Sequence, residues 1–149
     1  MNHTATKAYE SQMDWAGRNL ANNLNFIPDD KLNWKPAPTA NSALEIINHL
    51  VPNILRLSDI ISGGDGQFQV EPITTREAAQ AAINHAATEY SIQVSKLSQE
   101  ELERPVQLPF GEVPCSRACA LAVTEAINHH GQLTYIQTLL GDVESHLEF

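Results

Sequence analysis

An acid and a histidine recur at the same spacing in two segments of this 149-residue chain. Glu125 and His129 are four residues apart, and so are Glu45 and His49. Residues four apart project from one face of an α-helix, one turn from each other. A carboxylate on an apolar helix face is costly unless it is paired, and a divalent cation satisfies a carboxylate and an imidazole together. Two facing helices could therefore present an acid and histidines to a shared metal ion.

The same residues also have a more ordinary interpretation. A glutamate and a histidine one turn apart often form a surface pair without a ligand. His130 could be the inward histidine instead of His129, because adjacent helix positions are about 100° apart. His85 is expected in the core or behind the ligands, whereas His3 and His146 lie in end regions that we expect to fray.

Helix signals divide the chain into four long segments, which run from about residue 4 to 26, 41 to 62, 74 to 97 and 114 to 140. Ser42 and Glu45 form a capping box at the start of the second. Pro52 should kink that helix, because proline removes a backbone hydrogen bond. Gly141 suits the left-handed position that ends the fourth.

Apolar residues three and four positions apart follow the second and fourth segments, as is typical of amphipathic helices that pack together. We therefore predict an all-α fold, a four-helix bundle in a single domain over residues 1–149. Between the third and fourth helices, residues 104–114 are extended and broken by prolines. A strand-like piece at 106–108 is not expected to make a sheet alone.

Composition excludes several classes of function. The nine basic and 18 acidic residues give a net charge of −9, so the basic footprint of a nucleic-acid-binding protein is missing. No apolar run is long enough to span a membrane, and the first residues do not resemble a secretory signal. We therefore expect a cytoplasmic protein. Cys115 and Cys119 are expected to be small packing residues, although the start of a helix lowers the pKa of a thiol.

Several stretches resemble proteins of the DinB/YfiT-like family. Residues 24–36 resemble the family's linker, which reads roughly l-p-e-e-k-l-x-w-x-P, and residues 42–50 are similar to its S-x-x-e-i-l-x-H-l helix. Residues 109–111 match its p-f-G loop, and residues 129–141 resemble its H-R-G-Q-l ending followed by l-x-G. The resemblance spans about residues 5–141, and the order and spacing of the motifs make it specific.

The resemblance implies a four-helix bundle with up-down-down-up connectivity, frequently as a homodimer, with one divalent metal ion held by three histidines. The first family histidine matches His49 and the last matches His129, with His130 where the family usually has arginine. The remaining family histidine matches Glu125. This departure either converts the site to two histidines and one carboxylate or abolishes binding. Because that donor set suits Zn²⁺, Ni²⁺, Mn²⁺ or Fe²⁺, we expect His49, Glu125 and His129 to be the metal ligands.

Some relatives are thiol-dependent transferases or isomerases that use the metal to activate a low-molecular-weight thiol. The resemblance therefore implies a metal-assisted thiol-dependent transferase, or a hydrolase, that acts on a small molecule. The alternative is a non-catalytic dimeric bundle that serves as an interaction or stress module. A third hypothesis, a two-metal site that adds Glu45, is weakened because ferritin-like sites space glutamate and histidine by three residues.

Overall fold

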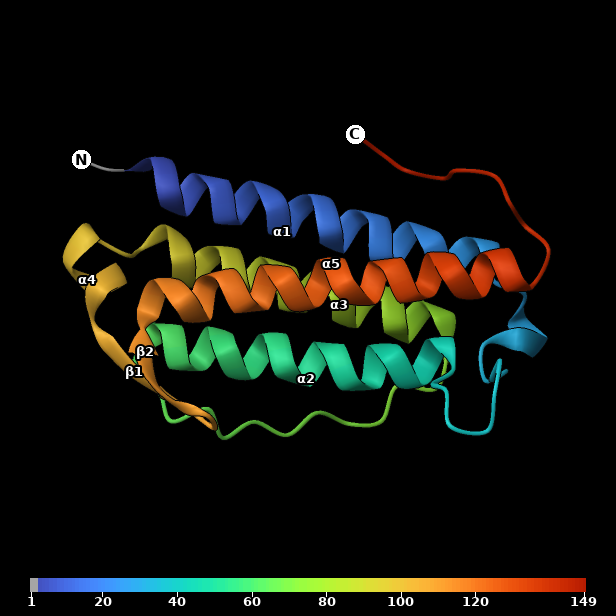
Figure 1. Ribbon diagram of the computed structural model, residues 1–149, viewed down its shortest axis with the longest axis horizontal. Coiled ribbons are helices and arrows are strands. Elements are labelled where there is room, and N and C mark those ends of the chain that lie inside the picture. The colour runs from blue at the N-terminus through green and yellow to red at the C-terminus, as the bar shows by residue number, and fades with distance from the viewer. Residues whose placement is uncertain (1–2) are drawn as a thin grey trace.

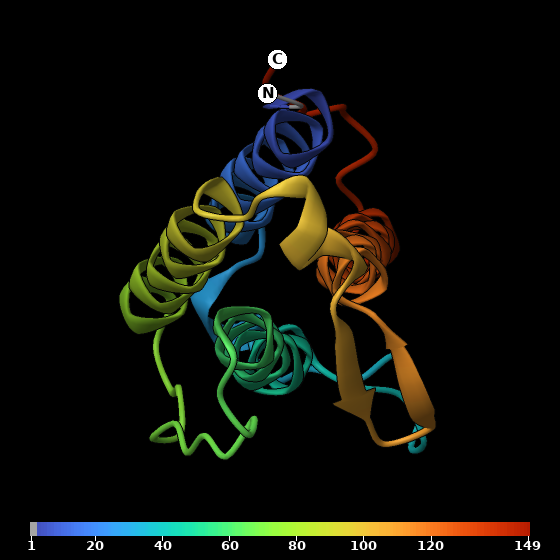
Figure 2. The ribbon, with the colours of Figure 1, turned by 90° about the vertical axis from the view of Figure 1, so that its left-hand side faces the viewer.

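The structure is a computed structural model that describes residues 3–149. Within that range, four long helices lie side by side: α1 (His3–Asn23), α2 (Ala43–Ser62), α3 (Arg76–Ser95) and α5 (Cys115–Leu139) (Figure 1). Both α1 and α2 pack against α3 and against α5, so the four helices stand at the corners of a square when viewed from one end (Figure 2). The predicted, mostly helical fold is confirmed.

The helix ends follow the local sequence signals. The Ser42 hydroxyl accepts a hydrogen bond from the Glu45 amide (3.2 Å), and the Glu45 carboxylate accepts one from the Ser42 amide (2.9 Å). This capping box satisfies backbone donors that the first turn leaves unpaired. Gly63 after α2 and Gly141 after α5 have φ angles of 99° and 101°, which glycine adopts without steric cost. The helix α2 continues through Pro52 as one element.

Shorter elements connect the long helices. The 3-10 turns η1 (Leu24–Phe26) and η2 (Asp29–Lys31) follow α1, and the short helix α4 (Gln99–Glu103) follows α3. Strands β1 (Pro105–Leu108) and β2 (Gly111–Pro114) then form an antiparallel hairpin that leads directly into α5.

The hairpin corrects the expectation that residues 106–108 would not make a sheet. Val106 and Leu108 of β1 are buried in the main core, whereas the alternating residues Pro105 and Gln107 are exposed. An isolated hairpin is marginally stable in water, but packing one face against a helical bundle supplies the missing apolar burial. The fourth helix, expected from about residue 114, begins at Cys115, since Pro114 is the last residue of β2 and the N-cap of α5.

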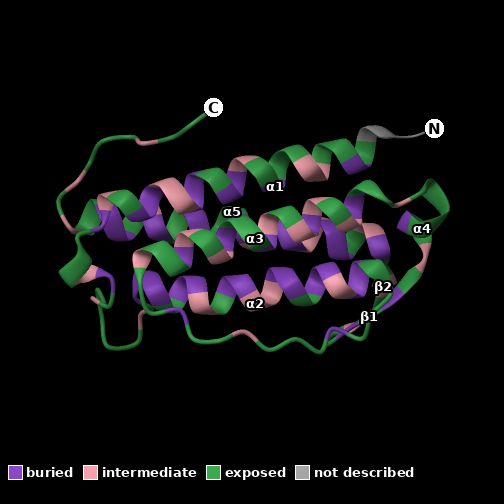
Figure 3. Ribbon diagram, turned by 180° about the vertical axis from the view of Figure 1, so that it is seen from behind, coloured by how far each residue is buried: buried purple, intermediate pink, exposed green. Residues whose placement is uncertain are grey.

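Each of the four long helices has a buried face (Figure 3), and the apolar side chains of these faces form one core inside the bundle. Burying a large apolar side chain contributes about 1.5–3 kcal/mol, so this shared core holds α2 and α5 together where they carry the candidate ligands. Its largest fully buried apolar side chains on the long helices are Met13, Leu20, Ile47, Leu50, Ile61, Tyr90 and Leu133.

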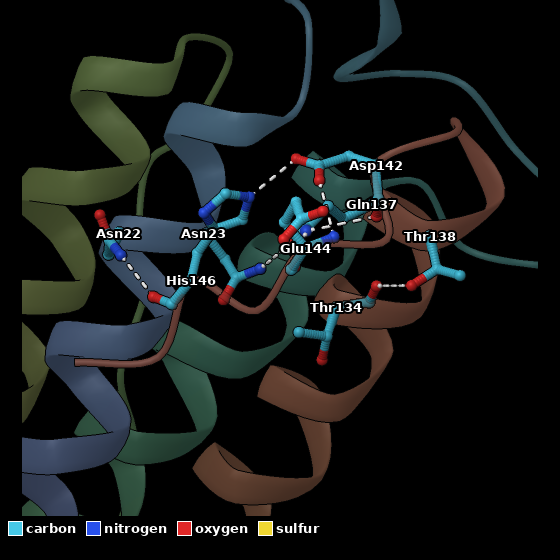
Figure 4. A network of polar contacts seen from close by, with 8 residues as sticks. All are labelled: Asn22, Asn23, Thr134, Gln137, Thr138, Asp142, Glu144 and His146. Atoms are coloured by element: carbon cyan, nitrogen blue, oxygen red, sulfur yellow. Dashed lines mark hydrogen bonds and ion pairs between the residues drawn. The ribbon is translucent and has the colours of Figure 1, made fainter. Parts of the chain in front are cut away.

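The C-terminal strap, residues 142–149, turns back along α1 (Figure 1). The Asn19 side chain donates to the Glu148 carbonyl (3.0 Å) and accepts from the Glu148 amide (2.8 Å). Asn22 donates to the His146 carbonyl at 2.8 Å. Figure 4 shows how the contacts of Asn22 and Gln137 tie the strap to α1 and α5.

His146 in the strap corrects the expectation of a frayed end. Its ring stacks on Phe26, with 3.4 Å between ring centroids, and its Nε2 lies 2.9 Å from an Asp142 carboxylate oxygen. The hydrogen bond from His146, followed by that from the Glu144 amide, lowers the pKa of Asp142 below its ordinary value. The side chain of His3 lies outside the described part of the chain.

Candidate metal centre

The centre lies where α2 and α5 pack together. His49 comes from α2, whereas Glu125 and His129 come from successive turns of α5. Each side chain offers one metal-binding atom, and these three atoms lie within 4.8 Å of one another. The two imidazole rings are tilted by 32°, with centroids 5.3 Å apart. The structure thus brings together the three residues that the sequence predicts as ligands.

His129 is held in one orientation by its own helix. Its Nδ1 lies 2.7 Å from the backbone carbonyl of Glu125, and the residue is only 6% exposed. Because a carbonyl can only accept, Nδ1 donates its hydrogen there and the lone pair of the neutral ring remains on Nε2. Histidines that bind metals usually donate their other ring nitrogen to a carbonyl or carboxylate in this way.

Glu125 is half-buried beside this ring, with a carboxylate oxygen 3.8 Å from Nδ1 of His129. In residues 3–149 no lysine or arginine forms an ion pair with Glu125. A partly buried carboxylate without a cationic side chain beside it suits a bound cation. The donor set therefore fits a divalent ion on chemical grounds, with two neutral imidazoles and one negative charge.

His49 is exposed and is contacted by residues that the sequence did not single out. Its Nε2 lies 3.1 Å from the side-chain nitrogen of Asn53, and Arg56 donates to the Asn53 side-chain oxygen at 2.9 Å. Asn53 and Arg56 follow His49 by four and seven residues along α2. This spacing places all three on one helix face, so the sequence could have identified them as neighbours of His49.

His130, the alternative inward histidine, is buried on another side of α5 and faces α1. The Asn23 amide nitrogen donates to Gln137 at 2.6 Å, so the Asn23 oxygen accepts from His130 Nε2 at 3.0 Å. The edge of the ring also packs against Trp15, with 5.5 Å between centroids. Burial lowers the pKa of His130, which favours the neutral ring.

Two further candidates do not join the centre. Glu45 caps α2 and pairs with Lys35 at 2.7 Å; the bonds from Lys35 and Ser42 lower its pKa. The structure therefore gives no support to the two-metal hypothesis. His85 is neither in the core nor behind the ligands, because its position on α3 leaves it exposed beside a cavity lined by Phe68 and Glu89.

Cys115 and Cys119 are free and fully buried, as expected of packing residues. A hydrogen bond from the Cys119 thiol lowers the pKa of Cys115 to about 7. The Arg104 guanidinium, 4.0 Å from the Cys115 sulfur, acts in the same direction. The same bond raises the pKa of Cys119, which keeps its proton.

A separate cavity lies away from the three ligands. The cavity of about 480 Å³ between α1 and α3 is lined by residues of these two helices alone, including Asp14 and Arg18. It is therefore distinct from the place where the donor atoms of His49, Glu125 and His129 converge. Across residues 3–149, none of the helices has both the length and the hydropathy needed to cross a membrane.

The chain is similar in sequence and in structure to known proteins. The chain is 29% identical over 136 residues to the uncharacterized protein YjoA of Bacillus subtilis, an alignment that covers 85% of this chain and 86% of YjoA. The YjoA crystal structure, described as DinB-like, superposes with a TM-score of 0.76 at 19% identity, covering 95% of this chain and 96% of YjoA.

Two other solved structures share the fold. A conserved protein from Enterococcus faecalis matches with a TM-score of 0.78 at 14% identity, over 92% of this chain and 98% of its own. A mycothiol-dependent maleylpyruvate isomerase matches with a TM-score of 0.70 at 12% identity, over 96% of this chain and 64% of its own. The sequence model of the DinB superfamily matches residues 12–133. This chain therefore belongs to the DinB superfamily.

Proposed function

We propose that this protein binds one divalent cation through His49, Glu125 and His129. The observation that carries the proposal is the convergence of these donor atoms, from two separate helices, to within 4.8 Å of one another. Two imidazoles and a carboxylate form a sound donor set for Zn²⁺, Ni²⁺, Mn²⁺ or Fe²⁺. The carboxylate of Glu125 would offset one of the two positive charges.

The two histidines would play different parts in the site, because one is buried and the other is exposed. His129 is buried and tied to the Glu125 carbonyl, so it presents Nε2 in a fixed direction. His49 is exposed, so the α2 side of the site is open to solvent and to a small molecule. A site with protein ligands on one side and an open side is typical of catalytic rather than structural metal centres.

We further propose that the reaction is a metal-assisted, thiol-dependent transfer, or a hydrolysis. A divalent cation in this site would supply a position at which a thiol or a water ionises near neutral pH. The fold shared with a mycothiol-dependent isomerase supports the thiol-dependent version. We assign the reaction to the cytoplasm, where low-molecular-weight thiols stay reduced.

An open cavity further along α2 supports a small-molecule substrate. Its volume is about 570 Å³, and it is lined by Arg56, Ile60, residues 65–68 and residues 107–109 at the hairpin. This volume lies within the usual range of ligand pockets. Arg56 connects it to the centre, because Arg56 donates to Asn53 and Asn53 contacts His49.

We also infer the up-down-down-up bundle topology and a homodimer. The topology is supported by Figure 1, in which α1 and α5 run in one direction while α2 and α3 run in the other. The homodimer is what the family resemblance implies. Light scattering on the purified protein checks it.

Zinc binding by metal-free protein tests the proposed function. Competition with a chromogenic chelator should give one Zn²⁺ per chain, and His49→Ala and His129→Ala should each weaken binding at least about tenfold. His85→Ala is the matched control, because His85 is exposed on a different helix and should leave the affinity unchanged. Equal affinities in all four proteins would contradict the proposal.

A further inference from the structure

Three residues of α2 form a short chain of hydrogen bonds that ends on a candidate ligand. Arg56 Nη1 donates to Asn53 Oδ1 at 2.9 Å, and Asn53 Nδ2 lies 3.1 Å from His49 Nε2. Spacings of three and four residues place these side chains in succession along one helix face.

The chemistry of the donors sets the direction of every bond in this chain. A guanidinium has five hydrogens to donate and cannot accept. Arg56 therefore requires the oxygen of the Asn53 amide, and the amide nitrogen is turned toward His49. Because that nitrogen can only donate, His49 Nε2 must accept, which leaves the ring hydrogen of neutral His49 on Nδ1.

We propose that Asn53, held by Arg56, is a latch on His49 that occupies the Nε2 lone pair until a cation displaces it. The proposal rests on the metal-binding function inferred above. In the tautomer that Asn53 selects, Nε2 carries the single lone pair that the ring can offer to a metal. Asn53 and a cation therefore compete for one site on the ring.

The two histidines of the centre differ in this respect. The contact of His129 uses Nδ1 and leaves Nε2 free, so it is compatible with a bound cation. The contact of His49 instead uses Nε2, the nitrogen that carries the lone pair a cation would need. When a cation binds Nε2 of His49, Asn53 cannot rotate its amide to present its oxygen instead. A rotated amide would turn its own hydrogens toward those of Arg56.

Displacing the latch requires little rearrangement. His49 and Arg56 are exposed and Asn53 is half-buried, so water can take over the hydrogen bond that the Asn53 amide loses. An interaction that exists only in the metal-free protein lowers the affinity for the cation, since binding must break it. Removing the latch should consequently strengthen binding, whereas removing a residue that supports the bound metal would weaken it.

Ring-nitrogen NMR tests the direction of the bonds without any metal. In chelator-treated protein labelled with ¹⁵N histidine, two- and three-bond correlations show which nitrogen of His49 carries hydrogen; His49→Gln identifies its signals. We expect the hydrogen on Nδ1 in the original protein, and a shift toward Nε2 in Asn53→Leu and Arg56→Met. Asn128→Leu is the control, because Asn128 is exposed on α5 and should leave His49 unchanged.

Zinc affinity of the same proteins tests the competition. Asn53→Leu should bind Zn²⁺ roughly two- to tenfold more tightly, as expected for the loss of one competing hydrogen bond, while Asn128→Leu matches the original protein. Hydrogen on Nε2 of His49 in the original protein, or unchanged or weaker binding by Asn53→Leu, would overturn the latch and leave the metal site standing. Failure of every protein to bind zinc would overturn both proposals.

Discussion

At the scale of single residues, Glu125 decides the character of the centre. It matches the position at which the family resemblance implies a third histidine, and its ligand atom lies within 4.8 Å of those of His49 and His129. A carboxylate in place of an imidazole adds a negative charge and a harder donor, without changing the number of ligands.

Substitution at Glu125 should separate the contribution of the donor from that of the charge. Glu125→His restores the three-histidine pattern and should keep zinc binding within about tenfold of the original, because imidazole is also a good zinc ligand. Glu125→Ala removes a donor and should weaken binding by about tenfold or more. Competition titration measures both. Binding unaffected by Glu125→Ala would show that the carboxylate is not a ligand.

The spacing of Glu125 and His129 was sufficient to predict that they share a helix face, because helical geometry is local. The partners of single side chains were not predictable in the same way. The bond between His130 and Asn23 joins residues 107 positions apart, and nothing in a local pattern shows that α1 offers an amide at that point. The tautomer of His49 likewise depends on the orientation of Asn53, which only the contact with Arg56 reveals.

At the scale of elements, α2 and α5 were predictable because the signals at their ends, a capping box for α2 and Gly141 for α5, agreed with their apolar periodicity. The short helix α4 and the hairpin were not, although Ser98 and Glu101 form a second capping box that could have indicated α4. Burial of Val106 and Leu108 against the bundle stabilises the hairpin, and that is a tertiary effect that local propensity does not contain.

The C-terminal strap should loosen in acid. The bonds from His146 and the Glu144 amide lower the pKa of Asp142, so the folded strap favours the ionised carboxylate. This contribution is fully present above the ordinary pKa of the carboxyl, and it is lost as the pH falls through the lowered value.

Asp142→Asn should remove that part of the acid dependence while the strap contacts of Asn19 persist. Amide NMR shifts of residues 144–148, followed from neutral pH to about pH 2, measure the change. Asp65→Asn, an exposed acid outside the strap, is the control. Identical titration of the strap in Asp142→Asn and in the original protein would contradict this assignment.

At the scale of the whole molecule, the centre joins α2 to α5, two helices that are separated in sequence by α3, α4 and the hairpin. An ion bound between them would bind the folded chain and not the unfolded one, and would therefore stabilise the bundle by mass action. The metal-free protein should still fold, because its apolar core is continuous without the ion.

Thermal unfolding should report this linkage. Zinc at about 100 times its dissociation constant should raise the stability by about 2.7 kcal/mol, which excess chelator should reverse. His129→Ala should lose the increase, and His85→Ala should keep it. An unchanged melting temperature at saturating zinc would favour the non-catalytic bundle.

Crystals of the zinc-loaded protein offer the most direct test of the centre. Diffraction data collected above and below the zinc absorption edge locate the ion and its ligands together. We predict one anomalous peak per chain, within about 2.0–2.2 Å of a ring nitrogen of His49, a ring nitrogen of His129 and a carboxylate oxygen of Glu125. A peak bound by other residues, or no peak between α2 and α5, would contradict the central claim.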